Sequence, residues 1–400
     1  MRYKKPSLFF YRLTQAVSWI VATFIFKRKV LRNEIKNQKE PFVLIANHQA
    51  KLDFVNIIGL RKKPMSFVIS NSFYNALPIK SILNKIGVIP KQQFQTGASD
   101  LKNIKAVIDA GESVVIYPAG LMCEDGLSTP IPSATYKFLK WLNVDVYIAR
   151  TYGSYFVMPK WARGMRSGRT YIDVYKLFSK EELNDTDLDS IKQITDDALL
   201  FDAYREQERF LVKYKNNKNI CGLENVLYQC PHCKTEFSTI IREDSIIECC
   251  ECGFFEQSDE YGFLHNLSGI GEEVRYISDW SRMIFSNLEE EIENGTEKYI
   301  CVSTEIYMIE NNKFVKAGSG EVVLDNEKIT LNGLIYGEET KVSVSVTYLP
   351  TLPFSPGKYF ELQNGKTIYR CVLNDGKLVM KLVNMLKIFH QNRVKEKQKV

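Results

Sequence analysis

The segment PFVLIANHQAKLDF, residues 41–54, places a histidine and an aspartate directly after an apolar run. The run PFVLIAN (41–47) predicts a buried strand, and His48 would lie in the turn that follows it. A helix that starts near Lys51 would carry Asp53 in its first turn, from where the carboxylate could reach back to the imidazole. On one continuous helix the two side chains would differ by roughly 140° around the axis and could not meet. The segment therefore predicts a strand, a turn and a helix, with a His–Asp pair at the end of the strand.

The same alternation of apolar runs and helix-like stretches continues to about residue 180. Two stretches, 77–87 and 99–111, carry apolar residues at helical spacing and end in glycine, as helices often do. Strands that alternate with helices predict an α/β domain with a mostly parallel sheet and flanking helices, which we place at 36–215. Its last part, 179–215, is charged and predicts a closing pair of helices followed by a linker. The other expected strands are 65–70, 113–120, 144–151 and 169–178.

A His–Asp pair at the end of a strand has a definite chemical use. A carboxylate bound to one ring nitrogen fixes the tautomer and leaves the other nitrogen free to take a proton from an alcohol. The ends of strands in α/β folds are also where active sites tend to lie. An isolated H-x4-D pattern is more often a surface histidine beside a helix N-terminus, so the surrounding sequence has to decide between the two.

That surrounding sequence resembles the glycerolipid (lysophospholipid) acyltransferase family, in which an NH-x4-D box opens a series of four. The segment ANHQAKLDF (46–54) is similar to the first box, and GVIPKQQF (87–94), VVIYPAGLMCEDG (114–126) and NVDVYIARTYGSYFVMPKW (143–161) follow in the order of the other three. The resemblance implies that His48 is the base that activates a substrate hydroxyl and that Asp53 orients it. The acyl donor would be a thioester, either acyl-CoA or acyl carrier protein. The family's substrate-binding positions fall on Asn47, Gly87, Lys91, Pro118 and Gly120.

Two boxes depart from the family pattern. The third box usually reads Glu-Gly-Thr, often followed by Arg, whereas this chain has Ala119-Gly120-Leu121-Met122. In the second box Gln93 stands near the usual Arg, and Lys91 could replace it. The side chains that handle a glycerol-phosphate acceptor are therefore missing, while the His–Asp pair is complete. The sequence predicts a membrane-associated O-acyltransferase acting on a lipid hydroxyl, and the alternative is a catalytically weak acyltransferase fold that serves as a lipid or protein scaffold.

A basic run follows the fourth box. Its cations could hold the donor's phosphates or lipid headgroups, or they could form a solvated edge of the domain. The four residues are Lys160, Arg163, Arg166 and Arg169.

A cysteine-rich module occupies residues 226–266. The stretch CPHCKTEFSTIIREDSIIECCECG (230–253) contains two C-x2-C knuckles separated by fifteen residues, a spacing typical of a zinc ribbon. Four thiolates close the coordination sphere, so the zinc would be structural. Nine cysteines without a convincing secretion signal also indicate a reducing compartment. The expected ligands are Cys230, Cys233, Cys249 and Cys252.

The N-terminal segment 1–35 predicts a helix at a membrane interface. SLFFYRLTQAVSWIVATFIF (7–26) is too polar in its first half for a confident membrane span but is rich in aromatic residues and flanked by lysine and arginine. The alternative is an apolar helix packed on the protein's own core. Together with the cysteines, the segment predicts a peripheral or monotopic protein on the cytoplasmic face of a membrane. The net charge of +6 is modest and concentrated at the ends of the chain, which argues against a nucleic-acid partner, and the oligomeric state is not predictable.

The C-terminal part consists of a helical connector at 267–297 and a β-rich domain at 298–400. The connector contains a helix at 278–295, and short β-type runs separated by Asn-Gly and Asn-Asn turns follow it. The last element is a helix with an apolar face. Seven or so strands and one terminal helix predict a mainly-β domain that resembles the pleckstrin-homology-like architecture. The apolar face of the helix comprises Leu378, Leu382, Leu386 and Phe389.

Overall fold

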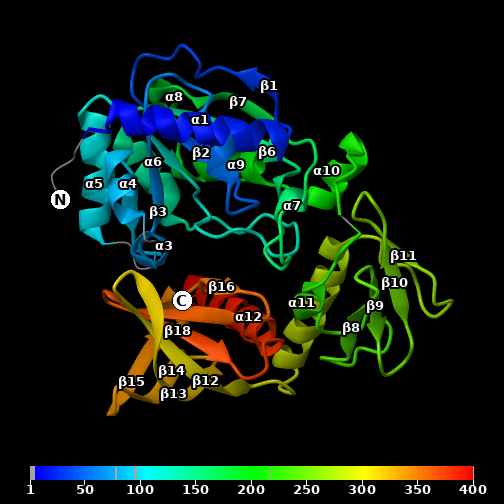
Figure 1. Cartoon of the computed structure of the whole chain (residues 1–400). Coiled ribbons are helices and arrows are strands. Elements are labelled where there is room, and N and C mark those ends of the chain that lie inside the picture. Colours follow the sequence, from blue (N-terminus) through cyan, green and yellow to red (C-terminus); the bar gives the residue numbers. More distant parts are fainter. Residues whose placement is uncertain (1–4, 77–78, 94–96, 217, 400) are drawn as a thin grey trace. The chain divides into compact units, whose positions relative to one another are not determined.

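The computed structural model describes residues 5–76, 79–93, 97–216 and 218–399. The chain divides into two compact units, each of which is treated by itself (Figure 1). The first unit comprises Met1–Lys160, Gly164–Asn217 and Glu260–Gly262, and the second comprises Trp161–Arg163, Lys218–Asp259 and Phe263–Val400. The cysteine module and the β-rich segment thus lie in one unit.

The first unit is built on a seven-stranded sheet. Neighbouring strands are parallel except for β6 and β7, which are antiparallel, so the mostly parallel sheet predicted from the sequence is confirmed. The strand order is β1-β7-β6-β2-β5-β3-β4. The strands are β1 (Lys29–Asn33), β2 (Phe42–Ala46), β3 (Met65–Ser70), β4 (Ile89–Lys91), β5 (Ser113–Ile116), β6 (Asp145–Tyr152) and β7 (Tyr171–Phe178).

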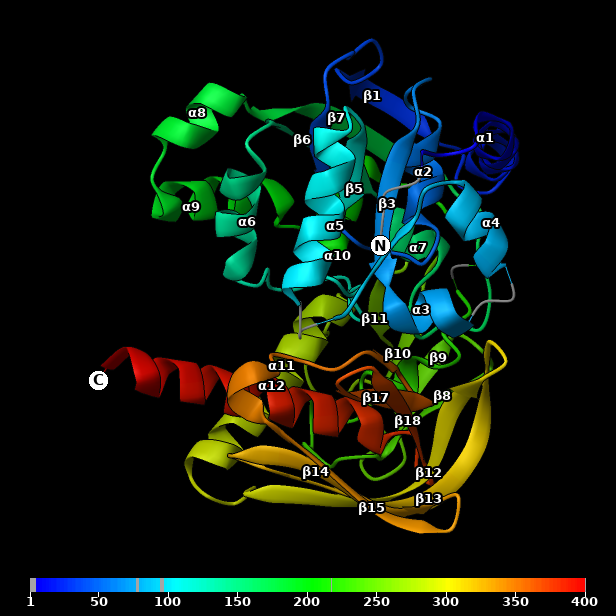
Figure 2. The ribbon, with the colours of Figure 1, turned by 90° about the vertical axis from the view of Figure 1, so that its left-hand side faces the viewer.

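Helices cover both faces of this sheet, because the central strands are buried on both sides (Figure 2). In β2, Val43 and Ile45 pack into a core with α5 (Ala98–Asp109), α6 (Ala134–Leu142), α8 (Lys180–Asp185) and α9 (Leu188–Leu199). The alternate residues Phe42, Leu44 and Ala46 pack into a second core with α1 (Leu8–Phe24) and α2 (Asp53–Ile58). Every residue of β2 is therefore buried, and the strand holds its C-terminal end rigidly in the middle of the sheet.

Several elements differ from the prediction. The expected helix pair over 179–215 is three helices, because Asp187 and Asp202 each accept backbone N–H bonds as N-caps and start a new helix. The third is α10 (Ala203–Phe210). The expected helix over 77–87 is described from residue 79 onward, and its helical part is α4 (Lys80–Lys85). The strands β1 and β4 and the helices α3 (Asn71–Ala76), α6 and α7 (Ser154–Val157) were not predicted.

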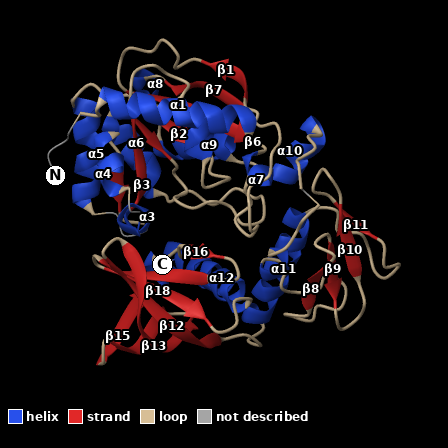
Figure 3. Cartoon of the chain, in the orientation of Figure 1, coloured by secondary structure: helices blue, strands red, loops and turns tan. Residues whose placement is uncertain are grey.

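The second unit contains two antiparallel sheets and two long helices (Figure 3). The four-stranded sheet follows the first cysteine knuckle and contains Cys249 of the second. It consists of β8 (Thr239–Arg242), β9 (Ile246–Cys249), β10 (Phe255–Ser258) and β11 (Leu264–Asn266). The helices are α11 (Ile277–Glu293) and the terminal α12 (Leu378–Lys399). The second sheet has the order β15-β14-β13-β12-β18-β17-β16. Its strands are β12 (Tyr299–Glu310), β13 (Lys313–Asp325), β14 (Lys328–Ile335), β15 (Glu338–Ser345), β16 (Phe354–Ser355), β17 (Tyr359–Asn364) and β18 (Thr367–Leu373).

The mainly-β architecture with a C-terminal helix agrees with the prediction. Residues 298–310, expected as two short strands, form the single long strand β12. Leu382, Leu386 and Phe389 of α12 are buried as expected, but so are Val379, Met380, Val383 and Met385 around the rest of the helix. The part of the helix from Val379 to Phe389 is therefore interior to its unit, whereas residues 395–397 are exposed. None of the helices in the described part of the chain combines the length and the apolar character that crossing a bilayer requires.

Candidate active site

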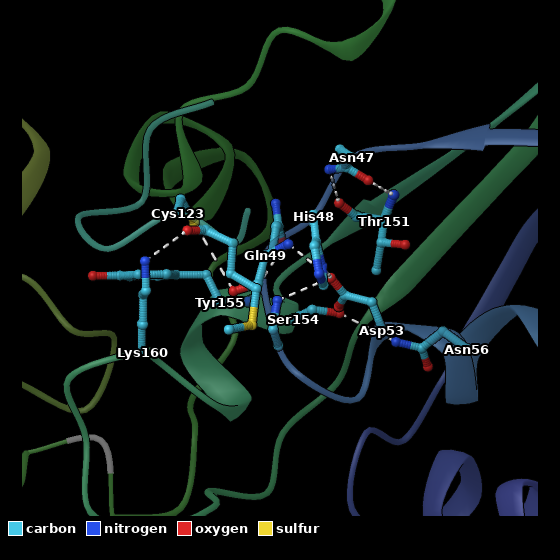
Figure 4. A network of polar contacts seen from close by, with 12 residues as sticks. Asn47, His48, Gln49, Asp53, Asn56, Cys123, Thr151, Ser154, Tyr155 and Lys160 are labelled. Carbon is cyan, nitrogen blue, oxygen red and sulfur yellow. Dashed lines mark hydrogen bonds and ion pairs between the residues drawn. The ribbon is translucent and has the colours of Figure 1, made fainter. Parts of the chain in front are cut away.

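The site lies at the C-terminal end of β2, where the chain turns toward α2. Asn47, the first residue after the strand, is buried and ties this end to β6. Its side-chain amide donates to the Thr151 carbonyl at 2.8 Å, and its Oδ1 accepts from the Thr151 N–H at 2.8 Å (Figure 4). The Asn47 side chain thus replaces a strand–strand hydrogen-bond pair and fixes the start of the turn that carries His48. Asn47 was predicted to bind substrate, and in the structure its side chain holds the backbone of the site.

His48 and Asp53 lie within hydrogen-bond distance, with 3.0 Å between His48 Nδ1 and Asp53 Oδ2. The same Oδ2 accepts the backbone N–H of Gln49 at 2.7 Å and that of Ala50 at 2.9 Å. The Asp53 side chain is 0 % exposed and the His48 side chain 20 %. Three donors therefore hold the carboxylate, and the engagement of Nδ1 leaves Nε2 as the imidazole nitrogen that can take a proton.

The third-box segment, which follows β5, closes one side of the site. The Tyr117 ring stacks on the His48 ring, with centroids 4.3 Å apart and an interplanar angle of 27°. Farther along, the Cys123 N–H donates to the His48 carbonyl at 3.3 Å, and the Cys123 thiol faces the Gln49 carbonyl at 3.9 Å. Burial and the nearby carboxylates Asp125, Glu124 and Asp53 raise the pKa of the Cys123 thiol, so it stays protonated and is unsuited as a nucleophile.

The second box reaches the third through Gln93, whose side-chain amide donates to the Gly120 carbonyl at 2.6 Å. Gly120 has a φ of +71°, which favours glycine, and an added Cβ there would have no heavy atom within 4 Å. Pro118 is buried in the same segment. Gln93 therefore connects the two boxes although it does not carry the charge that the family has at this position, and residue 94 of the second box lies outside the described residues.

The remaining predicted substrate residues lie on the β4 side. Lys91 ends β4, which pairs with β3, and burial lowers the pKa of its ammonium group while Asp100 opposes that shift. Gly87 lies before β4 with a φ of +79°, and a Cβ at this position would stand 2.6 Å from Pro6 Cγ. The close approach of Pro6 gives Gly87 a packing reason to be glycine. Its nearest neighbours are Pro6 and Ser66 rather than the His–Asp pair.

Part of the basic run after the fourth box is buried. The Lys160 side chain is 3 % exposed, donates to the Met122 carbonyl at 3.3 Å and lies 3.9 Å from the Glu124 carboxylate. Arg166 is also buried, and burial lowers its pKa to about 10. These two cations are therefore not part of a solvated edge, and Lys160 anchors the loop that touches His48.

Sequence reasoning did not identify two polar residues that support the site. Gln49 is fully buried, and its Oε1 accepts the Tyr155 N–H at 3.2 Å. Asn56 is also fully buried and donates to Ser154 Oγ at 3.1 Å, which connects α2 to α7 (Figure 4). A signal for Asn56 was present, since it lies three residues after Asp53 on the same helix face and interrupts an otherwise apolar stretch.

The second unit holds a four-cysteine cluster. The Sγ atoms of Cys230, Cys233, Cys249 and Cys252 all lie within 4.8 Å of one another. Tetrahedral Zn–S bonds of about 2.3 Å need thiolates somewhat less than 4 Å apart, so this donor set fits a metal ion such as zinc. Cys250 is exposed and is not part of the cluster. The geometry agrees with the ligands predicted from the two knuckles.

Comparisons with known proteins relate part of the first unit to a family. Residues 14–151, about a third of the chain, match the acyltransferase family. Among solved structures, the 1-acyl-sn-glycerophosphate (LPA) acyltransferase PlsC from Thermotoga maritima is similar over 50 % of this chain and 79 % of that chain, with 14 % identity and a TM-score of 0.41. A comparison with curated proteins finds no match. The family match covers the first three boxes and ends within β6.

Proposed function

We propose that this chain, an acyltransferase whose residues 14–151 form the domain characteristic of the family, moves a fatty acyl group from a thioester donor to a lipid hydroxyl at a membrane surface. The observation that carries the proposal is the His48–Asp53 pair, in which one carboxylate oxygen binds the imidazole at 3.0 Å and two backbone N–H groups hold that oxygen in place. The donor would be acyl-CoA or an acyl carrier protein thioester.

The reaction needs one base and no covalent acyl-enzyme. His48 Nε2 takes the proton of the acceptor hydroxyl as its oxygen attacks the thioester carbonyl carbon. The tetrahedral intermediate then expels the thiolate, which receives the proton from the imidazolium, so the products are an ester and a free thiol. Asp53 stabilises the imidazolium and keeps Nδ1 protonated. The raised pKa of the Cys123 thiol is consistent with direct transfer.

The orientation of α1 supports action at a membrane. Three of its polar side chains face the protein: Tyr11 accepts the Met65 N–H, the Gln15 amide donates to the carbonyls of Ile58 and Arg61, and Ser18 is buried. Its apolar side chains face outward, which is the reverse of a helix packed on a soluble core. Aromatic and aliphatic residues on an outward face suit the acyl region of a bilayer. The exposed residues are Leu8, Phe9, Leu13, Val17, Trp19, Ile20 and Phe24.

Basic residues near α1 would meet anionic headgroups. Lys5, Arg12, Lys27 and Lys29 belong to the described residues and are exposed, whereas Arg2 and Lys4 lie outside them. We place the protein peripherally on the cytoplasmic face of a membrane, because free thiolates that bind zinc need a reducing compartment.

The zinc ribbon would have a structural role. Four thiolates leave no open coordination position, so the metal would supply folding free energy to the second unit and no chemistry to acyl transfer.

The experiment that tests the function is thiol release from a long-chain acyl-CoA or acyl carrier protein by the purified full-length chain in anionic liposomes, with a panel of lysolipid and glycolipid acceptors. We expect acceptor-dependent release that is lost in His48→Gln. The chain offers a matched control in His265, which lies 3.0 Å from Asp259, and His265→Gln should retain activity. Release that survives His48→Gln contradicts the assigned base, and no release with any donor or acceptor supports the scaffold alternative.

A further inference from the structure

The two oxygens of the Asp53 carboxylate have different surroundings. Oδ2 accepts from His48 Nδ1 and from the N–H groups of Gln49 and Ala50. Oδ1 is buried and has no hydrogen-bond partner among the described residues. A buried carboxylate oxygen left without a donor is costly, and such an atom in a native structure needs an explanation.

A donor without a hydrogen-bond partner belongs to the residue that stacks on the imidazole. The Tyr117 hydroxyl is buried and has no hydrogen-bond partner within the described part of the chain. The Tyr117 ring stacks on His48 at 4.3 Å, so its hydroxyl lies beside the imidazole that Asp53 holds. Burial raises the pKa of the Tyr117 hydroxyl, and the Asp53 charge adds to this as the smaller cause. The hydroxyl therefore stays protonated and able to donate.

Strand register explains why Tyr117 lies against His48. In the parallel pair of β2 and β5, Ile45 lies opposite Ile116, so Tyr117 leaves β5 at the level where the chain leaves β2 for His48. The third box of this chain thus places a phenol ring against the imidazole of His48.

We propose that the Tyr117 hydroxyl donates a hydrogen bond to Asp53 Oδ1 through one water molecule, and thereby sets the proton affinity of His48. The consequence for catalysis rests on the proposed function, whereas the titration of His48 can be measured without it. Tyr117 acts through Asp53 and is a positioning residue.

The effect on His48 follows from charge. A donor on Oδ1 draws negative charge away from Oδ2 and weakens the attraction between the carboxylate and an imidazolium. Removing the hydroxyl should strengthen that attraction and raise the pKa of His48, so that a larger fraction is protonated at neutral pH.

Other ionisable groups near the pair come from several elements. The loop after β5 contributes Cys123, Glu124 and Asp125, and Lys160 pairs with Glu124. Arg28 donates to the Asn56 carbonyl of α2 at 2.7 Å, and Tyr155 of α7 bonds to the Tyr204 hydroxyl. A substitution that removes only the Tyr117 hydroxyl leaves all of these in place, so a change in His48 titration reports on that hydroxyl.

The test is an NMR titration of the zinc-loaded full-length chain with labelled histidine. The chain has four histidines, and His48→Gln identifies the signal of interest. Tyr117→Phe should raise the apparent pKa of His48 by about half a unit or more, and the acid limb of kcat/KM should move upward by the same amount. The matched control is Tyr136→Phe, which removes another hydroxyl bonded to a carboxylate, that of Asp196, in the opposite core. It should leave His48 unchanged.

A second variant keeps the test decisive if Tyr117→Phe does not fold. Difluorotyrosine at position 117 retains the hydroxyl and makes it a stronger donor, so the pKa of His48 should fall. A folded Tyr117→Phe protein with an unchanged His48 titration overturns the proposal, and so does a loss of kcat that is equal at every pH. The NMR readout needs no substrate, so its failure is distinguishable from a failure of the acyltransferase assay.

Discussion

The ammonium group of Lys381 in α12 lies 2.6 Å from the carboxylate of Glu236, a residue between the two cysteine knuckles. The same Nζ lies 2.8 Å from a carboxylate oxygen of Glu297, and Lys377, one turn earlier, donates to the carbonyls of Phe237 and Thr239. Lys377, just before the terminal helix, therefore holds the backbone after the first knuckle, and Lys381 in the helix holds two carboxylates. The ribbon is joined to the β-rich part of its unit by buried polar contacts, rather than being an independent appendage.

Replacing Lys381 by Met should destabilise the second unit. The substitution leaves the carboxylates of Glu236 and Glu297 close together without their cation, and both are partly shielded from water. We expect the free energy of unfolding to fall by about 2 kcal/mol. This is less than the loss of a fully buried ion pair would cause, because the two carboxylates keep some exposure to water.

The measurement is denaturant unfolding followed by the fluorescence of Trp280, whose indole N–H donates to the Gln229 carbonyl next to the first knuckle. Lys395→Met, at an exposed position of the same helix, is the control and should change little. Equal stability of Lys381→Met and the control would show that the contact with Glu236 contributes nothing.

Metal removal should disorder the same unit. The chelated protein should lose the folded signal of Trp280, which is buried and packs against Phe254 beside the last ligand, with ring centroids 6.0 Å apart. Cys249→Ser should abolish zinc binding in a metal-release assay.

The neighbouring cysteine provides the control for that assay. Cys250 is exposed and outside the cluster, so Cys250→Ser should keep the same zinc content as the original chain. Loss of zinc in Cys250→Ser with retention in Cys249→Ser would mean that the ligand set is wrong.

The sequence predicts the parts of the fold and the site that depend on local spacing. The His48–Asp53 pair, five residues apart, follows from a strand end and the helix start after it, and the cysteine cluster follows from two knuckles. β1 could not be predicted in this way, because its residues are mostly exposed and its pairing with β7 joins segments about 140 residues apart. The stacking of Tyr117 on His48 depends on the register between β2 and β5, which no local pattern encodes.

Asp53→Asn should separate chemistry from folding. An amide oxygen can still accept the N–H groups of Gln49 and Ala50, so the turn should form and the melting temperature should change little. The neutral amide cannot stabilise an imidazolium, and we expect kcat/KM to fall by about 10² to 10⁴.

The measurement is kcat/KM beside a thermal melt of the same preparation. Asp259→Asn, which alters the His265 pair in the second unit, should leave kcat/KM unchanged. An Asp53→Asn protein with full activity would remove the basis for assigning His48 as the base.

Stability of the second unit should fall as pH rises, because of Glu256. Burial, with the Glu273 charge as a smaller cause, raises the pKa of this carboxyl from its ordinary 4.5 to about 8, while the Val274 N–H opposes the shift. Folding favours the protonated form of Glu256. Below pH 4.5 the carboxyl is protonated in both states and does not lower the free energy of unfolding, whereas above about pH 8 the free energy of unfolding is lowered by the full amount.

Glu256→Gln should remove that dependence and retain an acceptor for the Val274 N–H. We expect the variant to be more stable than the original chain by about 2 to 4 kcal/mol at pH 9 and by little near pH 5. Unfolding curves of the zinc-loaded proteins between pH 6 and 9 measure this, and Glu251→Gln, at an exposed position, is the control. A constant difference across that range would contradict the assigned titration.

Membrane binding should depend on the outward face of α1. Phe9 and Phe24 are 72 % and 65 % exposed, so Phe9→Ser with Phe24→Ser removes apolar surface without opening a cavity in the domain. Burying a phenylalanine in an apolar phase stabilises by about 2 kcal/mol, and partial insertion of both should make the loss of vesicle affinity at least about tenfold.

Co-sedimentation with anionic and neutral vesicles at two salt concentrations measures this affinity. The control is Leu334→Ser with Tyr348→Ser, which removes two exposed apolar side chains of the second unit. We expect the control to bind vesicles as the original chain does. Added salt should weaken binding to anionic vesicles more than binding to neutral ones, because lysines and arginines flank α1. Equal loss of binding in both double variants would indicate nonspecific adsorption and would leave α1 without a role at the membrane.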